Sequence, residues 1–99
     1  MAVSDSKPLI TTIIPTYRRP RLLQRALRSV LAQSYPNFCV CVYDNASGDE
    51  TERVVREFMK YDSRVQYIQR SENIGAARNF DDAMRRGPHL FFPFFLTMT

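Results

Sequence analysis

Residues 38–49 of this 99-residue chain, FCVCVYDNASGD, decide the fold that the sequence predicts. The first half, 38–43, is almost unbrokenly apolar, which is typical of a strand buried on both faces of a parallel sheet. The second half is polar and contains Gly48, so it predicts a loop at the carboxyl end of that strand. Ligands of parallel α/β sheets bind beyond the carboxyl ends of the strands, and Asp44 is therefore a candidate site residue.

Strands and helices alternate on both sides of this stretch. This alternation implies right-handed crossovers and predicts an α/β fold, a Rossmann-like three-layer α/β/α arrangement with a mostly parallel sheet. The Ser47-x-x-Glu50 pattern predicts a capping box at the start of the second helix. The predicted strands are at 9–15, 38–43 and 64–69, the last near a sheet edge, with a fourth strand-like segment at 90–96. The predicted helices run from 21 to 33, from the capping box to about 61, and from 71 to a stop at Gly87 and Pro88.

Composition predicts one folded domain. An apolar fraction of 44% is ordinary for a globular protein, and a charged fraction of 24% argues against disorder. We expect a polar N-terminal tail at residues 1–8 and a domain at residues 9–99. The tail has no secretory signal pattern and no apolar run reaches the ~20 residues of a spanning helix, so the sequence predicts a cytoplasmic protein. The net charge of +4 comes from interspersed charges, and no nucleic-acid partner is predicted.

The chain lacks the motifs of several common sites. Its three glycines form neither the G-x-G-x-x-G of dinucleotide-binding folds nor a P-loop. Residues 44–50 lack the acids and the glycine that a calcium loop requires at fixed positions. Cys39 and Cys41 have no third cysteine or nearby histidine, so we interpret them as small core side chains rather than zinc ligands.

Two side chains at the predicted strand ends carry binding chemistry. The carboxylate of Asp44 can accept a hydrogen bond from a base edge or a sugar hydroxyl, although a loop-ordering or helix-capping acid would occupy the same place. Tyr17, just after the first predicted strand, can stack on a flat ring, although a half-buried loop aromatic is the alternative. Spacing alone leaves both interpretations open for both residues.

Four motifs, in order, carry a family resemblance. They are Ile13–Arg19 (IIPTYRR), Ser29–Pro36 (SVLAQSYP), Val42–Thr51 (VYDNASGDET) and Asn73–Asn79 (NIGAARN). Together they resemble the I-P-T-Y-N-R, S-x-L-x-Q-x-Y, V-D-D-x-S-x-D-x-T and N-x-G-x-x-x-A-R-N motifs of family 2 glycosyltransferases, the last being one residue shorter here.

The resemblance implies a GT-A fold, of which this chain would hold the N-terminal nucleotide-binding part. It also implies a nucleotide-diphosphate sugar donor, of UDP type. By that analogy Pro15, Thr16 and Tyr17 line the nucleoside pocket, with Tyr17 against the base. Asp44 would accept the base N–H. Arg78 would lie near the diphosphate or stabilise the Asp44 loop, since a guanidinium group binds either phosphate or carboxylate through two hydrogen bonds. The alternative is an arginine exposed on the helix without a binding role.

The sequence departs from the family pattern in two respects. Arg18 stands where the family usually has asparagine or a small residue. In the family, a fourth strand leads into an Asp-x-Asp or Asp-Asp motif that holds Mg²⁺ or Mn²⁺ on the donor, whereas no acid follows Asp82 here. Asp81 and Asp82 are adjacent on the third predicted helix and are interpreted as surface acids. The family's catalytic base also lies further along, so we assign no metal ligand and no catalytic residue and expect no sugar transfer by this chain alone.

Other functions and partners stay open at this level. A non-catalytic nucleotide-binding or interaction module derived from the same scaffold would also lack those acids, and the acceptor of a transferred sugar is unknown. Residues 90–96, LFFPFFL, are more apolar than a strand entering a polar site needs, and they predict self-association. Because acceptors in the family can be lipid-linked, the resemblance implies the inner face of the membrane as a further location of the full-length protein.

Overall fold

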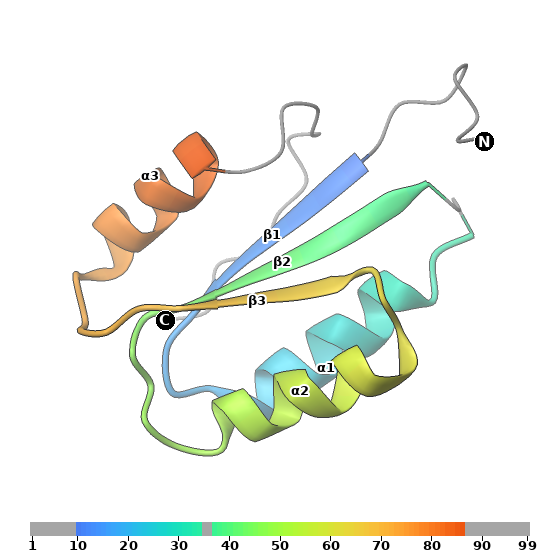
Figure 1. The fold of residues 1–99 in the computed structure, drawn as a ribbon, viewed down its shortest axis with the longest axis horizontal. Coiled ribbons are helices and arrows are strands. Elements are labelled where there is room, and N and C mark those ends of the chain that lie inside the picture. Colours follow the sequence, from blue (N-terminus) through green and yellow to red (C-terminus); the bar gives the residue numbers. More distant parts are fainter. Residues whose placement is uncertain (1–9, 35–36, 87–99) are drawn as a thin grey trace.

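The computed structural model describes residues 10–34 and 37–86, in which strands and helices alternate (Figure 1). The strands form one sheet in the order β1-β2-β3, and both neighbouring pairs are parallel. This arrangement confirms the predicted α/β fold with its parallel sheet. The elements are β1 (Ile10–Thr16), α1 (Pro20–Leu31), β2 (Phe38–Asp44), α2 (Thr51–Tyr61), β3 (Val65–Gln69) and α3 (Ala76–Arg86).

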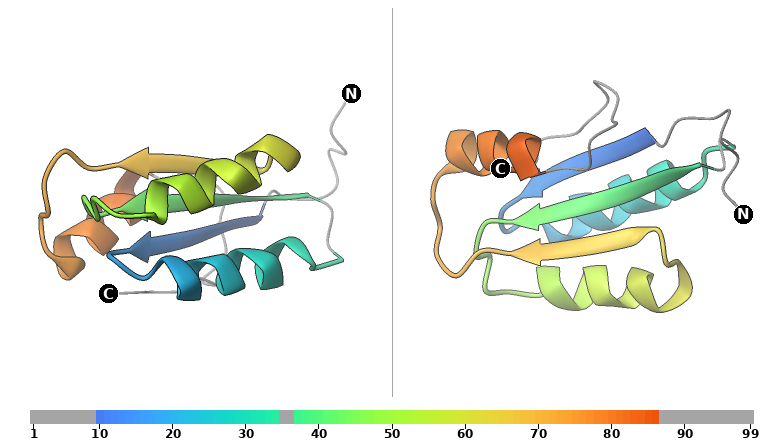
Figure 2. Two further views of the ribbon diagram at one scale, coloured as in Figure 1. Left: turned by 90° about the horizontal axis from the view of Figure 1, so that it is seen from below. Right: turned by 45° about the horizontal axis from the view of Figure 1, so that its top comes forward.

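The sheet lies between two layers of helices, as a three-layer fold requires (Figure 2). Helices α1 and α2 cover one face, and α3 covers the other. The larger apolar cluster lies under α1 and α2, where Leu23, Leu27 and Val55 are fully buried. A smaller cluster, which includes Ile13 and Ala83, lies under α3. Burial of apolar side chains on both faces holds the three layers together.

Strand β2 occupies the centre of the described sheet. All seven of its residues are buried, because strands flank it on both sides and helices cover both of its faces. Cys39 and Cys41 belong to the cluster under α3 and carry free thiols, which confirms that they are core side chains. Strand β3 lies at an edge of the described sheet, with Gln66 and Gln69 exposed, as its alternating sequence predicted.

Two helix starts differ from the predictions. Helix α2 begins at Thr51 without the capping box predicted for Ser47 and Glu50, because the Ser47 side chain bonds elsewhere. The carboxylate of Asp49 instead accepts hydrogen bonds from the Thr51 N–H (2.9 Å) and hydroxyl (2.6 Å). Helix α3 begins at Ala76 rather than 71, since Gly75 has a φ of +88° and cannot continue a right-handed helix backwards.

Several predictions fall on residues outside those that the structure describes. They are the N-terminal tail at 1–8, the end of the domain towards residue 99, and the apolar segment at 90–96 with its predicted self-association. The helix stop predicted at Gly87 and Pro88 also lies there. All of these stay predictions.

Replacing Asp49 by alanine tests the observed start of α2. At pH 7 we expect a loss of about 1 kcal/mol in unfolding free energy, measured by urea titration, because the first N–H of the helix loses its acceptor. Burial acts to raise the pKa of Asp49, but the hydrogen bonds from Thr51 and the charge of Arg18 outweigh it and lower the pKa. The contribution is therefore full above the unfolded pKa of about 3.9 and disappears as pH falls through the lower folded value.

Glu50 supplies the matched control for this substitution. Its side chain is 71% exposed and makes one surface ion pair with Arg53, so Glu50→Ala should change the free energy by no more than about 0.5 kcal/mol. A larger loss at Glu50 than at Asp49 would contradict the observed cap and favour the predicted capping box.

Candidate functional site

The three strands end side by side, which brings the loops that follow them to one edge of the sheet. Thr16 pairs with Asp44, and Asp44 pairs with Gln69. The Asn45 N–H then donates to the Thr16 carbonyl (2.9 Å), which ties the first two loops together beyond the strands. We call this region the strand-end edge; it consists of the loops at residues 17–19, 45–50 and 70–75 (Figure 1).

Asp44 lies at the centre of the strand-end edge, and only 1% of its surface is exposed. Its Oδ1 accepts hydrogen bonds from the Ser47 N–H (3.0 Å) and the Ser47 hydroxyl (2.6 Å). Its Oδ2 accepts a bond from the Tyr67 hydroxyl (2.5 Å). A carboxylate offers about four lone-pair positions, so three are used within the protein and one is left for a further donor.

Tyr67 is the partner of Asp44 on β3. Burial, and then the hydrogen bond to the Asp44 carboxylate, raise the pKa of the Tyr67 phenol above its usual value. The phenol therefore keeps its proton at any ordinary pH and acts as a donor only. The Arg56 guanidinium lies over the Tyr67 ring, 5.6 Å from its centroid, and covers it from the side of α2.

Ser47 joins the loop after β2 to the loop after β1. The Arg18 N–H donates to the Ser47 hydroxyl (2.8 Å), and Arg18 Nε donates to the Ser47 carbonyl (3.1 Å). The Arg18 guanidinium also lies over the ring of Tyr17, 5.2 Å from its centroid. A continuous chain of hydrogen bonds thus runs from Arg18, just after β1, through Ser47 and Asp44 at the end of β2, to Tyr67 within β3.

Two non-glycine residues of these loops have left-handed backbone conformations. Arg18 has a φ of +51° and Ala46 a φ of +62°, which side chains other than glycine and asparagine adopt at a cost of roughly 1–2 kcal/mol. Both positions flank the Ser47 contacts that hold them in place.

Asparagine side chains hold the third loop. Asn45 Oδ1 accepts a hydrogen bond from the Ile74 N–H (2.9 Å), and Asn45 Nδ2 donates to Asn73 Oδ1 (3.0 Å). The same oxygen of Asn73 accepts a bond from the Gly75 N–H (2.7 Å). The turn before α3 is therefore anchored to the loop after β2 through amide groups.

Asn79 anchors helix α3 to the end of β2. It is fully buried, and its Nδ2 donates to the Tyr43 carbonyl (3.0 Å) while its Oδ1 accepts a bond from Arg70 Nε (2.8 Å). Arg70 also forms an ion pair with Asp82, whose side chain is 32% exposed. The interpretation of Asp82 as a surface acid is therefore wrong, because the Arg70 guanidinium draws it against the sheet. Asp81 is a surface acid that pairs with an exposed arginine, as expected.

The structure brings four of the five predicted site residues to the ends of β1 and β2. Pro15 and Thr16 are buried, and the Thr16 hydroxyl has no hydrogen-bond partner among the described residues. Tyr17 is half-buried, and Asp44 lies one strand away. Arg78 is exposed on α3, where it lines a hollow of about 450 Å³ without a hydrogen bond to the described part of the Asp44 loop. The ligand-binding roles of all five residues stay predictions.

Sequence reasoning assigned no role to several residues that build this edge. Asn73 and Asn79 belong to the fourth motif quoted above. Their polar side chains beside a predicted apolar helix face could have indicated a structural role. Tyr67 and Arg70 gave no local signal, because their partners lie 23 and 9 residues away. Only the pairing of parallel strands brings Tyr67 to Asp44.

A divalent metal does not fit the described residues. Within 10–34 and 37–86, no three histidine, cysteine, aspartate or glutamate side chains gather closely enough to hold an ion. Asp44, Asp49 and Asp82 are each engaged by groups of the protein itself. Residues 87–99 lie outside this statement.

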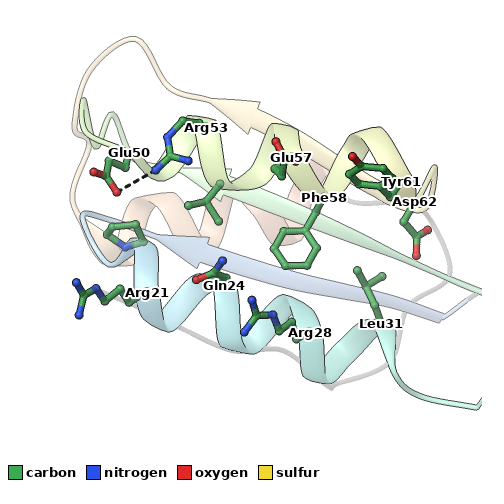
Figure 3. Close-up of a pocket in the computed structure, with 12 residues that line it drawn as sticks. Arg21, Gln24, Arg28, Leu31, Glu50, Arg53, Glu57, Phe58, Tyr61 and Asp62 are labelled. Atoms are coloured by element: carbon green, nitrogen blue, oxygen red, sulfur yellow. Dashed lines mark hydrogen bonds and ion pairs between the residues drawn. The ribbon is translucent and has the colours of Figure 1, made fainter.

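A larger groove lies away from the strand-end edge, between α1 and α2 (Figure 3). It has a volume of about 510 Å³ and an apolar floor that includes Leu31, Val54 and Phe58. In the described part of the chain, no helix has the length and apolar character needed to cross a membrane.

Comparison with known proteins places the chain in a family. The sequence model of glycosyl transferase family 2 matches residues 11–89. The chain belongs to this family. TuaG of Bacillus subtilis, a glycosyltransferase assigned to teichuronic acid biosynthesis, is 31% identical over 92 residues and matches 93% of the chain. The GalNAc(5)-diNAcBac-PP-undecaprenol beta-1,3-glucosyltransferase of Campylobacter jejuni is 35% identical over 61 residues, 62% of the chain.

A solved structure supports the same assignment. The mannosyltransferase PcManGT of Pyrobaculum calidifontis, in complex with GDP-Man and Mn²⁺, matches 83% of the chain with a TM-score of 0.74 and 29% identity. The fold of the family 2 chain is thus that of the GT-A glycosyltransferases, as the motifs implied. The chain spans 36% of TuaG, 20% of the Campylobacter enzyme and 25% of PcManGT, so activity, substrates and partners are matters of proposal.

Ala46→Gly tests the backbone strain in the loop after β2. Glycine adopts a positive φ freely, so we expect unfolding free energy to rise by about 0.5–1 kcal/mol, after the entropy that glycine costs is subtracted. Ala77→Gly is the matched control, because Ala77 is an exposed residue inside α3 and should lose about 1 kcal/mol. Urea titration checks both values, and a loss at position 46 would show that no strain is stored there.

Tyr67→Phe tests the hydrogen bond to Asp44. We expect a loss of about 1.5–3 kcal/mol in unfolding free energy, because a buried carboxylate loses a donor. In an alkaline titration followed at the tyrosinate absorbance, the native wild type and Tyr67→Phe should show the same change up to pH ~11, since Tyr67 does not ionise there.

The raised pKa of Tyr67 also determines how the stability of the protein changes with pH. Because folding raises the pKa of Tyr67, its stabilisation is full below the unfolded pKa of about 10 and is lost at higher pH, so the wild type should lose stability more steeply there than the variant. Tyr61 is 81% exposed and supplies the matched control, so Tyr61→Phe should change the unfolding free energy by no more than about 0.5 kcal/mol. An equal loss of stability in Tyr67→Phe and Tyr61→Phe would contradict the buried bond.

Proposed function

We propose that this chain forms the nucleoside-binding part of a glycosyltransferase that takes its sugar from a nucleotide-diphosphate donor. Family membership supports the reaction class, and the GDP-Man held by the similar mannosyltransferase supports the donor class. The acceptor is not identified by any residue of the strand-end edge.

The hydrogen-bond chain from Arg18 to Tyr67 is the observation that carries this proposal. It fixes the ends of β1 and β2 relative to each other, and the half-buried Tyr17 follows β1, which pairs with the strand that ends at Asp44. A base that stacks on Tyr17 brings its ring N–H towards the one lone-pair position of Asp44 that the protein does not use. Pro15 and Thr16 form the wall behind that base.

Arginines supply the charge for the diphosphate. The Nε of Arg18 is held by the Ser47 carbonyl, while its two terminal amino groups make no hydrogen bond within the described residues. Arg78, exposed at the start of α3, adds a second guanidinium on the same edge of the sheet. Guanidinium groups bind phosphate oxygens in pairs, which fits both residues to this task.

The described residues perform binding and orientation, and no metal-dependent step is assigned to them. In the family a divalent ion supplies charge stabilisation at the leaving diphosphate. No group of acids in the described chain fits that ion, so we expect the chain alone to transfer no sugar. The same observation favours the second candidate, a non-catalytic nucleotide-binding module built on this scaffold.

Titration calorimetry with UDP and with GDP tests the proposal. Uracil and guanine both carry a ring N–H, so Asp44 by itself can accept a hydrogen bond from either base. We propose UDP as the donor nucleotide because of the sequence motifs. Asp44→Asn replaces an acceptor oxygen by a donor, and we expect Kd to rise by about 10- to 100-fold. Asp81→Asn, on the surface of α3, should leave Kd unchanged.

A second pair of variants protects the test against misfolding. Tyr17→Ala should weaken binding by about 3- to 10-fold through loss of stacking, whereas Tyr61→Ala on α2 should not. Circular dichroism melts establish that each variant is folded. Nucleotide binding that survives in both Asp44→Asn and Tyr17→Ala would refute the assigned site, and tighter binding of GDP than of UDP would overturn the proposed base.

A further inference from the structure

Helix α1 carries a strip of arginines and contains no acidic residue. Arg21, Arg25 and Arg28 recur at helical spacing, and all three are exposed. No acidic residue occurs anywhere between Asp5 and Asp44 in the sequence. We call these three side chains the α1 strip; over its length of about 10 Å it presents one sign of charge only.

Six other basic side chains of the described structure form ion pairs. On α2, Arg56 and Lys60 each pair with a glutamate of the same helix, and Arg53 pairs with Glu50, the residue just before the helix. Further along, three more arginines pair with aspartates: Arg64 with Asp62, Arg70 with Asp82 and Arg85 with Asp81. The α1 strip has no ion pair within residues 10–34 and 37–86.

The groove between α1 and α2 shows this separation directly (Figure 3). Arg21 and Arg28 lie on its α1 side, while Glu57 and Asp62 lie on its α2 side. The marked ion pair among the lining residues joins Glu50 to Arg53 and stays on α2. Among the described residues, the acids on the α2 side form their ion pairs with Arg53, Lys60 and Arg64 and form none with the α1 strip.

We propose that the α1 strip is a docking surface for a membrane that contains anionic phospholipids. Guanidinium groups bind phosphate oxygens, and a row of arginines along one exposed helix face meets a flat, negatively charged surface with all its charges at once. Their long aliphatic stems lie along the helix while their charged ends reach the headgroups.

Leu22 favours a membrane over a nucleic acid as the partner. Its side chain is 45% exposed and precedes Arg25 by one turn on the outer side of α1, where an apolar group can enter the headgroup region. Single-stranded nucleic acids are bound instead through aromatic side chains between basic ones, and α1 contains no aromatic residue.

The docked orientation relates this surface to the strand-end edge. Helix α1 begins at Pro20, directly after the Arg18 loop, so a membrane along its outer face lies next to the loops at the carboxyl ends of the strands (Figure 2). The proposal does not depend on the proposed function, because its test uses no nucleotide.

Co-sedimentation with lipid vesicles tests the α1 strip. The chain should bind vesicles of phosphatidylglycerol in phosphatidylcholine and not vesicles of phosphatidylcholine alone, and binding should weaken as salt is added. Each basic side chain at an anionic surface strengthens partitioning about fivefold, so Arg21→Gln/Arg25→Gln/Arg28→Gln should lose about a hundredfold. Leu22→Gln should cause a smaller loss on the anionic vesicles.

The matched control is Arg53→Gln/Arg56→Gln/Lys60→Gln on α2. It lowers the net charge by the same three units but removes side chains that are already paired, so it should bind anionic vesicles at least ten times more tightly than the α1 variant. Equal losses in the two triple variants would overturn the proposal, as would undiminished binding to neutral vesicles. Release of the protein from anionic vesicles by an equimolar oligonucleotide would identify nucleic acid as the preferred partner and overturn it too.

Discussion

The structure depends on one buried carboxylate. Asp44 ends the central strand with 1% of its surface exposed, and a charge in that position is tolerated only when hydrogen-bond donors surround it. The donors come from its own loop through Ser47 and from the neighbouring strand through Tyr67. Ser47 then binds the Arg18 backbone, so the need to satisfy one acid determines how the loops after β1 and β2 are placed.

The same requirement explains the strained backbone beside it. Arg18 and Ala46 adopt left-handed conformations that neither side chain favours, and both flank the contacts of Ser47. The hydrogen bonds around Asp44 offset that local cost. Rigid loops of this kind are suited to hold a flat base in one orientation, because little conformational freedom is lost when the ligand binds.

Charge is distributed unevenly along the chain. The acids of the described chain begin at Asp44, and most of them pair with basic residues of α2, of the segments that flank β3, and of α3. Helix α1 precedes every one of these acids, and its exposed arginines form no ion pair within residues 10–34 and 37–86. The charges of α2 and the segments after it are thus largely neutralised by ion pairs within the protein. Helix α1 keeps its positive charge, which is available to an external anion.

The sequence by itself determined the order of the elements, the parallel sheet, the burial of β2 and the family. These follow from local patterns: an unbroken apolar run at 38–43, helical spacing in α1 and α2, and four motifs in order. The capping box was predicted wrongly, because the Ser47 hydroxyl bonds to Asp44 and the Asp49 carboxylate caps Thr51 instead. The start of α3 was predicted too early, because Gly75 takes a positive φ.

Tertiary structure alone decided which polar groups meet. Whether Asp44 ordered a loop or offered an acceptor could not be read from spacing, and the structure shows that it does order the loop while one lone-pair position is left unused. The roles of Tyr67, Asn79 and Arg70 likewise depend on partners brought close by strand pairing and by the packing of α3. Local sequence specifies the path of the chain, whereas contacts between distant residues form only when the apolar faces of strands and helices are buried together.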